Sequence, residues 1–312
     1  WWRLAAPSVA ITSVVGCAAF VLHREAPALA AASPCPGLLE AAFIIGARAR
    51  RSSEIGPWLI ASWGAALVLA VAAVTWVGRR VTGGWSTASA TALTLGLLPL
   101  FARALAPPDA VAVALSAAWL AMVLSSHPLD RSRPHPLALS AILVLVACVV
   151  PPLAIPLAGV AIVAGLERRG ESGAISTAAM TVVLTIGLPV VLGAVMPSLP
   201  PDASGPSASC VLTTAGLTAP GRTWHAARDV VVGPGGIYAV VLASLGAFTL
   251  RRKIASRAAW TVLCFALFPL VVAGAPVGPT TRLLAPTLVG WWALVAVGLC
   301  FHVFAYVLND VV

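Results

Sequence analysis

The chain is poor in charged residues. Only 9% of its 312 residues are Asp, Glu, Lys or Arg, whereas 60% are hydrophobic and the mean hydropathy is +0.99. A soluble domain carries about 25% charged residues, so this chain has too few to cover a water-facing surface. The composition therefore predicts an all-α, polytopic integral membrane helix bundle, with residues 1–312 forming a single membrane domain.

Lysine is almost absent, because Lys253 is the one lysine among 19 basic residues. The formal net charge of +9 raises the question of nucleic-acid binding. That function needs a basic face with interleaved aromatic residues, but the arginines are dispersed in loop-sized groups. We therefore expect no nucleic-acid partner, and we interpret the charge as the arginine bias of a cytoplasmic membrane surface.

Ionisable side chains are lacking from the middle of the apolar segments, where no Asp, Glu or Lys occurs. Such groups mark proton-coupled transporters, ion pumps and cation channels, so a transporter or flippase is disfavoured. His302 lies in the last apolar segment among aromatic residues, and we interpret it as a packing histidine. Haem ligation would need a second buried histidine, and the other four lie near segment ends or in loops.

The cysteines show no metal-binding spacing, since neither CxxC nor a Cys/His cluster occurs. We therefore expect no metal centre built from cysteine and histidine. Cys35 and Cys210 fall in two long polar loops, where they could pair if both loops face an oxidising compartment. The remaining four lie in apolar runs, where we expect small buried hydrophobic side chains: Cys17, Cys148, Cys264 and Cys300.

Long apolar runs recur along the chain and predict about ten membrane segments. A group of prolines at 151, 152 and 156 interrupts one continuous apolar stretch. That stretch is either two short helices that meet inside the membrane or one broken helix. The predicted segments are 6–23, 57–78, 86–103, 108–126, 136–150, 151–166, 174–196, 235–250, 259–275 and 286–308.

The distribution of basic residues predicts the orientation, because short cytoplasmic loops carry an excess of Arg and Lys. With the N-terminus in the cytoplasm, the short outer loops hold only Arg103 and Arg282. We therefore expect a multi-pass protein of the cell inner (plasma) membrane. The cytoplasmic side then holds 11 basic residues: Arg3, Arg79, Arg80, Arg131, Arg133, Arg168, Arg169, Arg251, Arg252, Lys253 and Arg257.

Two long outer loops follow from this orientation. The first, 24–56, contains a short amphipathic stretch around Leu38 and Leu39, whose apolar face could lie on the membrane surface. The second, 197–234, begins as a linker rich in Pro, Ser and Gly. It then carries the sequence WHAARD, which pairs Trp224 with position 228 at helical spacing.

The outer loops also hold the candidate functional residues. Glu25 directly follows the first segment, where a carboxylate could act as general base or hold a divalent metal for a lipid-linked donor. The alternative is a solvated charge at a helix end. Trp224 and His225 could bind a sugar or an acceptor, or anchor the loop at the interface. Three arginines could hold a phosphate, or merely contact lipid phosphates: Arg48, Arg50 and Arg51.

Residues 23–101 resemble the GT-C-type membrane glycosyltransferases, especially the bacterial protein O-mannosyltransferase-like group. The first loop reads HREAPALAAASPCPGLLEAAFIIG, with Pro34 to Gly37 where that group has an HPPG-like turn. A later helix ends in RRVTG at 79–83, like the family's arginine-rich helix end. The resemblance covers roughly residues 1–170. It implies a GT-C-like fold, a polyprenyl-phosphate sugar donor, and sugar transfer outside the cytoplasm with an acidic base on the first outer loop.

The sequence departs from that family at its acidic motif. The family has an Asp-x-x-Glu-like pair near the end of helix one; Glu25 matches the second position, but Leu22 occupies the first. The histidine of the HPPG-like turn is missing as well. Two hypotheses follow: a GT-C-like protein that retains the scaffold with or without transferase activity, and a non-catalytic membrane subunit of a larger complex, whose small residues permit close helix packing.

Overall fold

A computed structural model of the chain describes its helical central and C-terminal parts. The described residues are 38, 76, 107–124, 136–195, 221–222, 224–225, 228, 236–254, 259–272, 284–299 and 301–302. These residues are almost entirely helical and contain no strand, which confirms the all-α class for this part of the chain. The predicted segments 6–23 and 86–103 lie outside the described residues, as does nearly all of 57–78.

The helices begin within one or two residues of the predicted apolar segments, except where the prolines at 151 and 152 delay one start. Prolines mark several of these starts, because proline is tolerated in the first turn, where its missing N–H has no partner to lose. The helices are α6 (Pro107–Leu124), α7 (Pro136–Val149), α8 (Ala154–Glu167), α9 (Ala174–Val195), α13 (Gly236–Thr249), α14 (Ala259–Leu267) and α16 (Ala285–Leu299).

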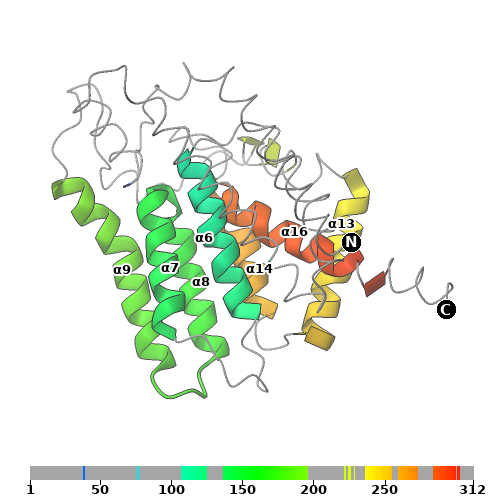
Figure 1. The fold of residues 1–312 in the computed structure, drawn as a ribbon, viewed down its shortest axis with the longest axis horizontal. Coiled ribbons are helices and arrows are strands. Elements are labelled where there is room, and N and C mark those ends of the chain that lie inside the picture. Colours follow the sequence, from blue (N-terminus) through cyan, green and yellow to red (C-terminus); the bar gives the residue numbers. More distant parts are fainter. Residues whose placement is uncertain are drawn as a thin grey trace, which may run out of the picture.

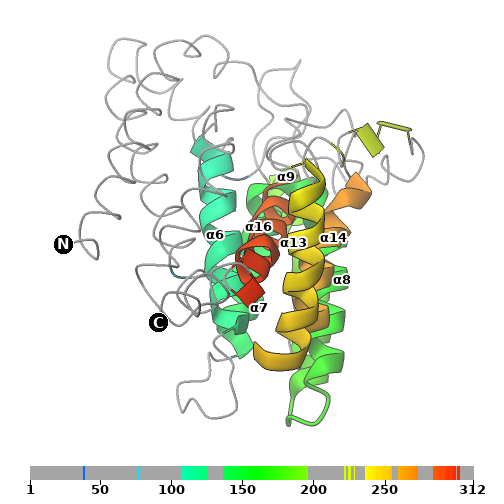
Figure 2. The same ribbon diagram turned by 90° about the vertical axis from the view of Figure 1, so that its right-hand side faces the viewer.

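The helices pack as a bundle in which α6, α7, α8 and α9 lie roughly alongside one another (Figure 1). Helix α9 contacts both α7 and α8, and α14 contacts α8 on the other side. Helix α16 runs obliquely through the bundle, touches α6 and α14, and crosses α13 (Figure 2). The core between them is built almost wholly from apolar side chains, with Trp119 and Phe265 among the largest that are fully buried.

The proline-rich interruption separates two short helices. Residues Pro151–Leu153 form a single 3-10 turn between α7 and α8, and the Leu153 N–H donates to the Val150 carbonyl at 2.9 Å. This turn is buried, and the two helices fold back side by side (Figure 1). Of the two alternatives for this stretch, the structure therefore has two short helices.

Close backbone contact joins α13 to α16 through two glycines. A Cβ atom placed on Gly246 would collide with the backbone of Leu294, lying 2.8 Å from its carbonyl carbon. A Cβ placed on Gly298 would collide in the same way with Leu242, again 2.8 Å from the carbonyl carbon. Only a residue without a side chain permits this approach, so the two glycines fix where the helices cross.

Helix α9 is the one described helix that is both long and apolar enough to cross a membrane. The other apolar helices within the described residues are shorter. The described part therefore confirms helices at the expected positions but does not confirm ten membrane crossings. Much of the surface of α9 is apolar and uncovered; the side chain of Val183, for example, is 69% exposed.

Candidate functional site

Charged side chains gather at one end of the bundle, where the turn between α8 and α9 lies close to the start of α14. Glu167, the last residue of α8, accepts hydrogen bonds from the backbone N–H groups of Trp260 at 3.0 Å and Thr261 at 3.2 Å. It also accepts one from the Thr261 hydroxyl. The first N–H groups of a helix have no partner within it, so Glu167 caps α14 from a different helix.

The protonation of Glu167 reflects two opposed effects. Partial burial raises the pKa of its carboxyl above the ordinary value, because it disfavours the charged form. The hydrogen bonds from Thr261 and Trp260 and the nearby Arg168 guanidinium lower it and oppose that rise. Glu167 directly follows the apolar stretch 151–166, so its carboxyl group lies at the polar end of the bundle. With three donors already engaged, the carboxylate is a structural acceptor and not a free general base.

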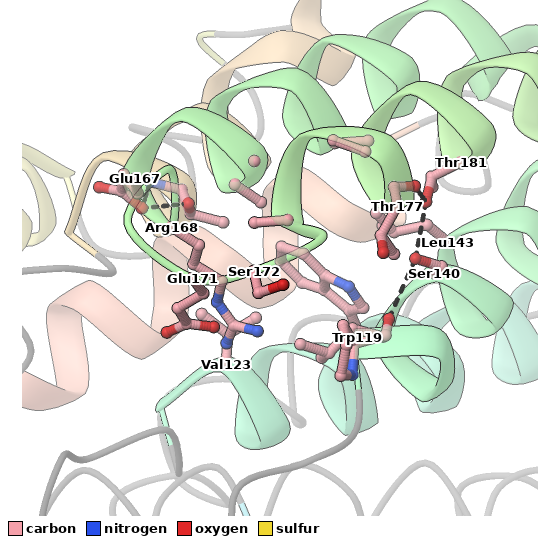
Figure 3. A pocket seen from close by; sticks show the side chains of 18 residues that line it. Trp119, Val123, Ser140, Leu143, Glu167, Arg168, Glu171, Ser172, Thr177 and Thr181 are labelled. Atoms are coloured by element: carbon pink, nitrogen blue, oxygen red, sulfur yellow. Dashed lines mark hydrogen bonds between the residues drawn. The ribbon is translucent and has the colours of Figure 1, made fainter.

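A cavity of about 80 Å³ opens beside this cap, between α6, α7, α8, α9 and the start of α14. Figure 3 shows Glu167, Arg168, Glu171 and Ser172 at one side of the cavity and Ser140, Thr177 and Thr181 at the other. Apart from Thr261 and the indole ring of Trp119, its remaining lining is apolar. Because its charged residues include both signs, the cavity has no strong preference for an anion or a cation.

Hydroxyl groups line this cavity on the side formed by α7 and α9. Thr181 of α9 donates to the Ser140 hydroxyl of α7 at 2.6 Å or to the Thr177 carbonyl at 2.6 Å, and its single proton serves one of them at a time. Ser140 in turn donates to the Pro136 carbonyl at 3.0 Å. These bonds link α7 to α9 across an otherwise apolar interface, as polar side chains do between membrane helices.

Trp119 of α6 forms part of the cavity wall and is only 1% exposed. Its ring stacks on Phe265 of α14, with the ring centroids 4.5 Å apart and the planes 24° from parallel. Its indole N–H has no hydrogen-bond partner among the described residues. Buried donors are normally paired with protein or ordered water, so this unpaired N–H is one of the exceptions within the described core.

Within the described ranges no group of three or more His, Cys, Asp or Glu side chains could hold a metal ion. Two cysteines lie within the described residues. Cys148 is buried, Cys264 is half-buried, and both are free thiols. The burial predicted for these two apolar-segment cysteines is thus confirmed for Cys148 and met in part by Cys264.

The residues predicted to be functional are only partly described. The described fragments of 221–228 are drawn at the end of the bundle where α13 begins (Figure 1). Trp224 and His225 belong to them and are exposed, Trp224 by 65%. Glu25 and the arginines at 48, 50 and 51 lie outside the described residues, as does nearly all of the amphipathic stretch in 24–56. No contact between these two groups can therefore be described.

His302 fits the expected packing role in part. Its Nε2 atom lies 2.8 Å from the Thr249 hydroxyl of α13, so the ring has a hydrogen-bond partner, although the residue is exposed. Glu167, like Trp119, Ser140 and Thr181, was not predicted from the sequence. A carboxylate directly before two arginines at the end of an apolar run was the one local signal for Glu167.

Comparison with known proteins finds no relative: no family model, no curated protein and no solved structure matches the chain.

Proposed function

We propose that this chain is a multi-pass helical protein of the plasma membrane, related to the GT-C glycosyltransferases that use polyprenyl-phosphate sugars. The observation that carries the membrane part is the apolar outer surface of the described helices. Large apolar side chains are exposed on α7, α8, α9 and α13, among them Leu145, Ile162, Val183 and Val241. A monomer in water rarely exposes so extensive an apolar surface, whereas lipid covers it at no cost.

The hydroxyl side chains of the helices support the same proposal. Thr185 donates to the Thr181 carbonyl at 2.6 Å, Ser244 to the Val240 carbonyl at 2.8 Å, and Thr249 to the Leu245 carbonyl at 2.9 Å. Each hydroxyl is thus satisfied by its own helix, one turn back. This arrangement suits surroundings that offer no water to bond with.

The placement of the arginines supports the proposed orientation. Arg169 lies in the turn between α8 and α9, and Arg251 lies at the end of α13, with its guanidinium over the ring of Trp260 at the start of α14. Figure 1 draws both segments at the same end of the bundle, whereas α9 ends and α13 begins at the opposite end. The basic end is then cytoplasmic, and 197–234 leaves from the outer end.

The proposed reaction follows from the resemblance and from the residues of the two outer loops. Glu25 would take the proton from an acceptor hydroxyl, whose oxygen then attacks the anomeric carbon of the sugar. The bond from that carbon to the polyprenyl phosphate breaks, and the phosphate leaves with the electron pair. Trp224 and His225 would hold the sugar or the acceptor. Arg48, Arg50 and Arg51 would bind the leaving phosphate.

The test is sugar transfer by the full-length protein in liposomes that contain a polyprenyl-phosphate sugar. We expect Glu25→Gln to lower the initial rate by at least 100-fold, as loss of a general base does. Glu40→Gln, which removes a carboxylate from the same loop, is the matched control and should leave the rate within about twofold. Equal rates for the wild type and Glu25→Gln would remove Glu25 from the mechanism.

A non-catalytic subunit of a larger membrane complex is the second candidate, and the open side of α9 favours it. Exposed apolar side chains lie all along that helix, including Ile175, Met180, Val183 and Val191. If these face a partner protein, photo-crosslinkers placed at Val183 should give a protein adduct of defined mass in native membranes. Crosslinks to lipid alone, together with sugar transfer by the isolated chain, would rule this candidate out.

A further inference from the structure

The end of α13 differs from the other helix ends in its winding and its charge. Residues Leu250–Ile254 form a π-helical turn with the sequence LRRKI. Turns of this kind are rare and often occur at functional sites. Both Arg251 and Arg252 are exposed there, on the charged end of the bundle.

Each of these two arginines lies over an aromatic ring. The central guanidinium carbon of Arg251 is 5.7 Å from the ring centroid of Trp260, and that of Arg252 is 4.5 Å from the ring centroid of Phe248. Ring faces attract a guanidinium electrostatically, which holds both side chains in place. The rings are themselves 53% exposed, so each arginine stands beside an apolar surface that is open to the surroundings.

Neither guanidinium is neutralised within the described part of the chain, where no carboxylate forms an ion pair with Arg251 or Arg252. The carboxylate on the adjoining helix end, Glu167, is engaged by the N–H groups of Trp260 and Thr261 and by the Thr261 hydroxyl. Among the described residues, therefore, no carboxylate competes with an external anion for the N–H donors of either arginine.

We propose that Arg251 and Arg252, together with Trp260 and Phe248, form a binding site for the phosphodiester head group of an anionic phospholipid. Guanidinium groups bind phosphate oxygens through paired N–H donors, and aromatic rings such as these favour the boundary between lipid and water. The cytoplasmic leaflet supplies the anionic lipid that basic groups at this surface attract. The site rests on the membrane orientation proposed above, and it is separate from the outer-loop chemistry.

The test is native mass spectrometry of the full-length protein released from nanodiscs that contain equal amounts of phosphatidylglycerol and phosphatidylethanolamine. We expect the wild type to retain phosphatidylglycerol preferentially. Arg251→Gln and Arg252→Gln should each lower the retained phosphatidylglycerol by roughly fivefold, because each variant loses the charge-assisted paired N–H donors that contact the phosphate. Arg251→Lys should retain more than Arg251→Gln, because it keeps the charge but loses the paired donors.

Arg169→Gln is the matched control, because it removes an equal charge from an exposed position at the same end of the bundle. We expect less than a twofold effect from it. An equal loss for Arg169→Gln and Arg251→Gln would mean general surface charge and would overturn the site. Displacement of the lipid by millimolar inorganic phosphate would also overturn it, because the ligand would then be a soluble anion.

A topology reporter separates this proposal from the one on which it rests. A fusion at position 254 that reports a cytoplasmic location, combined with no preference for phosphatidylglycerol, would defeat the lipid site alone. A fusion that reports an external location would defeat the proposed orientation, and the lipid site with it.

Discussion

Gly246 and Gly298 lie at one crossing point, each pressed against the backbone of the helix that carries the other. A Cβ atom added to Gly246 would come within 3.0 Å of the backbone nitrogen of Gly298 itself. In the membrane proposed above, helices would gain nothing from hiding apolar surface from water, and such close packing would be a main source of their association. The contact between α13 and α16 therefore depends on these two positions more than on the larger side chains around them.

Alanine at either glycine should destabilise the protein. Because the clashing atoms belong to the backbone, one helix must shift, and we expect Gly246→Ala or Gly298→Ala to lower the free energy of unfolding by about 1–3 kcal/mol. Gly187→Ala on α9 is the control, since a Cβ there meets nothing within 4 Å. It should be neutral or stabilising by up to about 1 kcal/mol. Thermal unfolding in detergent measures the stability of all three variants. If Gly246→Ala were as stable as the wild type, the close contact between α13 and α16 at this position would be wrong.

Removing the Glu167 side chain should weaken the attachment of α14 to α8. Glu167→Ala leaves the first N–H groups of α14 without this acceptor, and loss of such a cap costs about 0.5–2 kcal/mol. Glu167→Gln should cost less, because its amide oxygen still accepts a hydrogen bond and the partial burial of a charge is relieved. Unfolding in detergent near neutral pH measures both variants. A larger loss for Gln than for Ala would contradict the capping role.

The bond between Ser140 and Thr181 should show a small coupling energy. We expect a double-mutant cycle of Ser140→Ala and Thr181→Val to give about 0.6 kcal/mol, the average for hydrogen bonds between membrane helices. Thr185→Val is a suitable comparison, because Thr185 bonds to its own helix at the Thr181 carbonyl. It should show no coupling to Ser140→Ala. A coupling energy near zero for the Ser140 and Thr181 pair would mean that their contact adds no stability.

The two ends of the bundle should be accessible from opposite sides of the membrane. In a variant without the six native cysteines, a membrane-impermeant maleimide should label His225→Cys in intact cells. Ser172→Cys, in the exposed turn between α8 and α9, should react only after the cells are permeabilised. Labelling of both positions from outside would contradict the proposed orientation.

The starts of the helices could be predicted from the sequence because apolar runs and prolines determine them locally. Pro136 begins α7, and the prolines at 151 and 152 form the turn that precedes α8. The run expected over 259–275 forms α14 only to Leu267 and continues as a 3-10 stretch through Val272, where Pro269 cannot donate to a regular helix.

The pairing of helices could not be predicted in the same way. Ser140 and Thr181 lie 41 residues apart. Nothing in the sequence of either segment indicates that the two side chains form a hydrogen bond. The crossing of α13 and α16 could not be predicted for the same reason. A glycine in an apolar run does not indicate which other helix packs against it. The roles expected for Glu25 and for the arginines at 48, 50 and 51 stay predictions, because these four lie outside the described residues. The roles expected for Trp224 and His225 also stay predictions.

The Glu167 cap also bears on the order in which the chain can assemble. Its partner Thr261 lies 94 residues further along the chain. During synthesis, Glu167 is therefore made before the helix that it caps. Until then the hairpin of α8 and α9 lacks this contact, and α14 can dock only after that hairpin has been made.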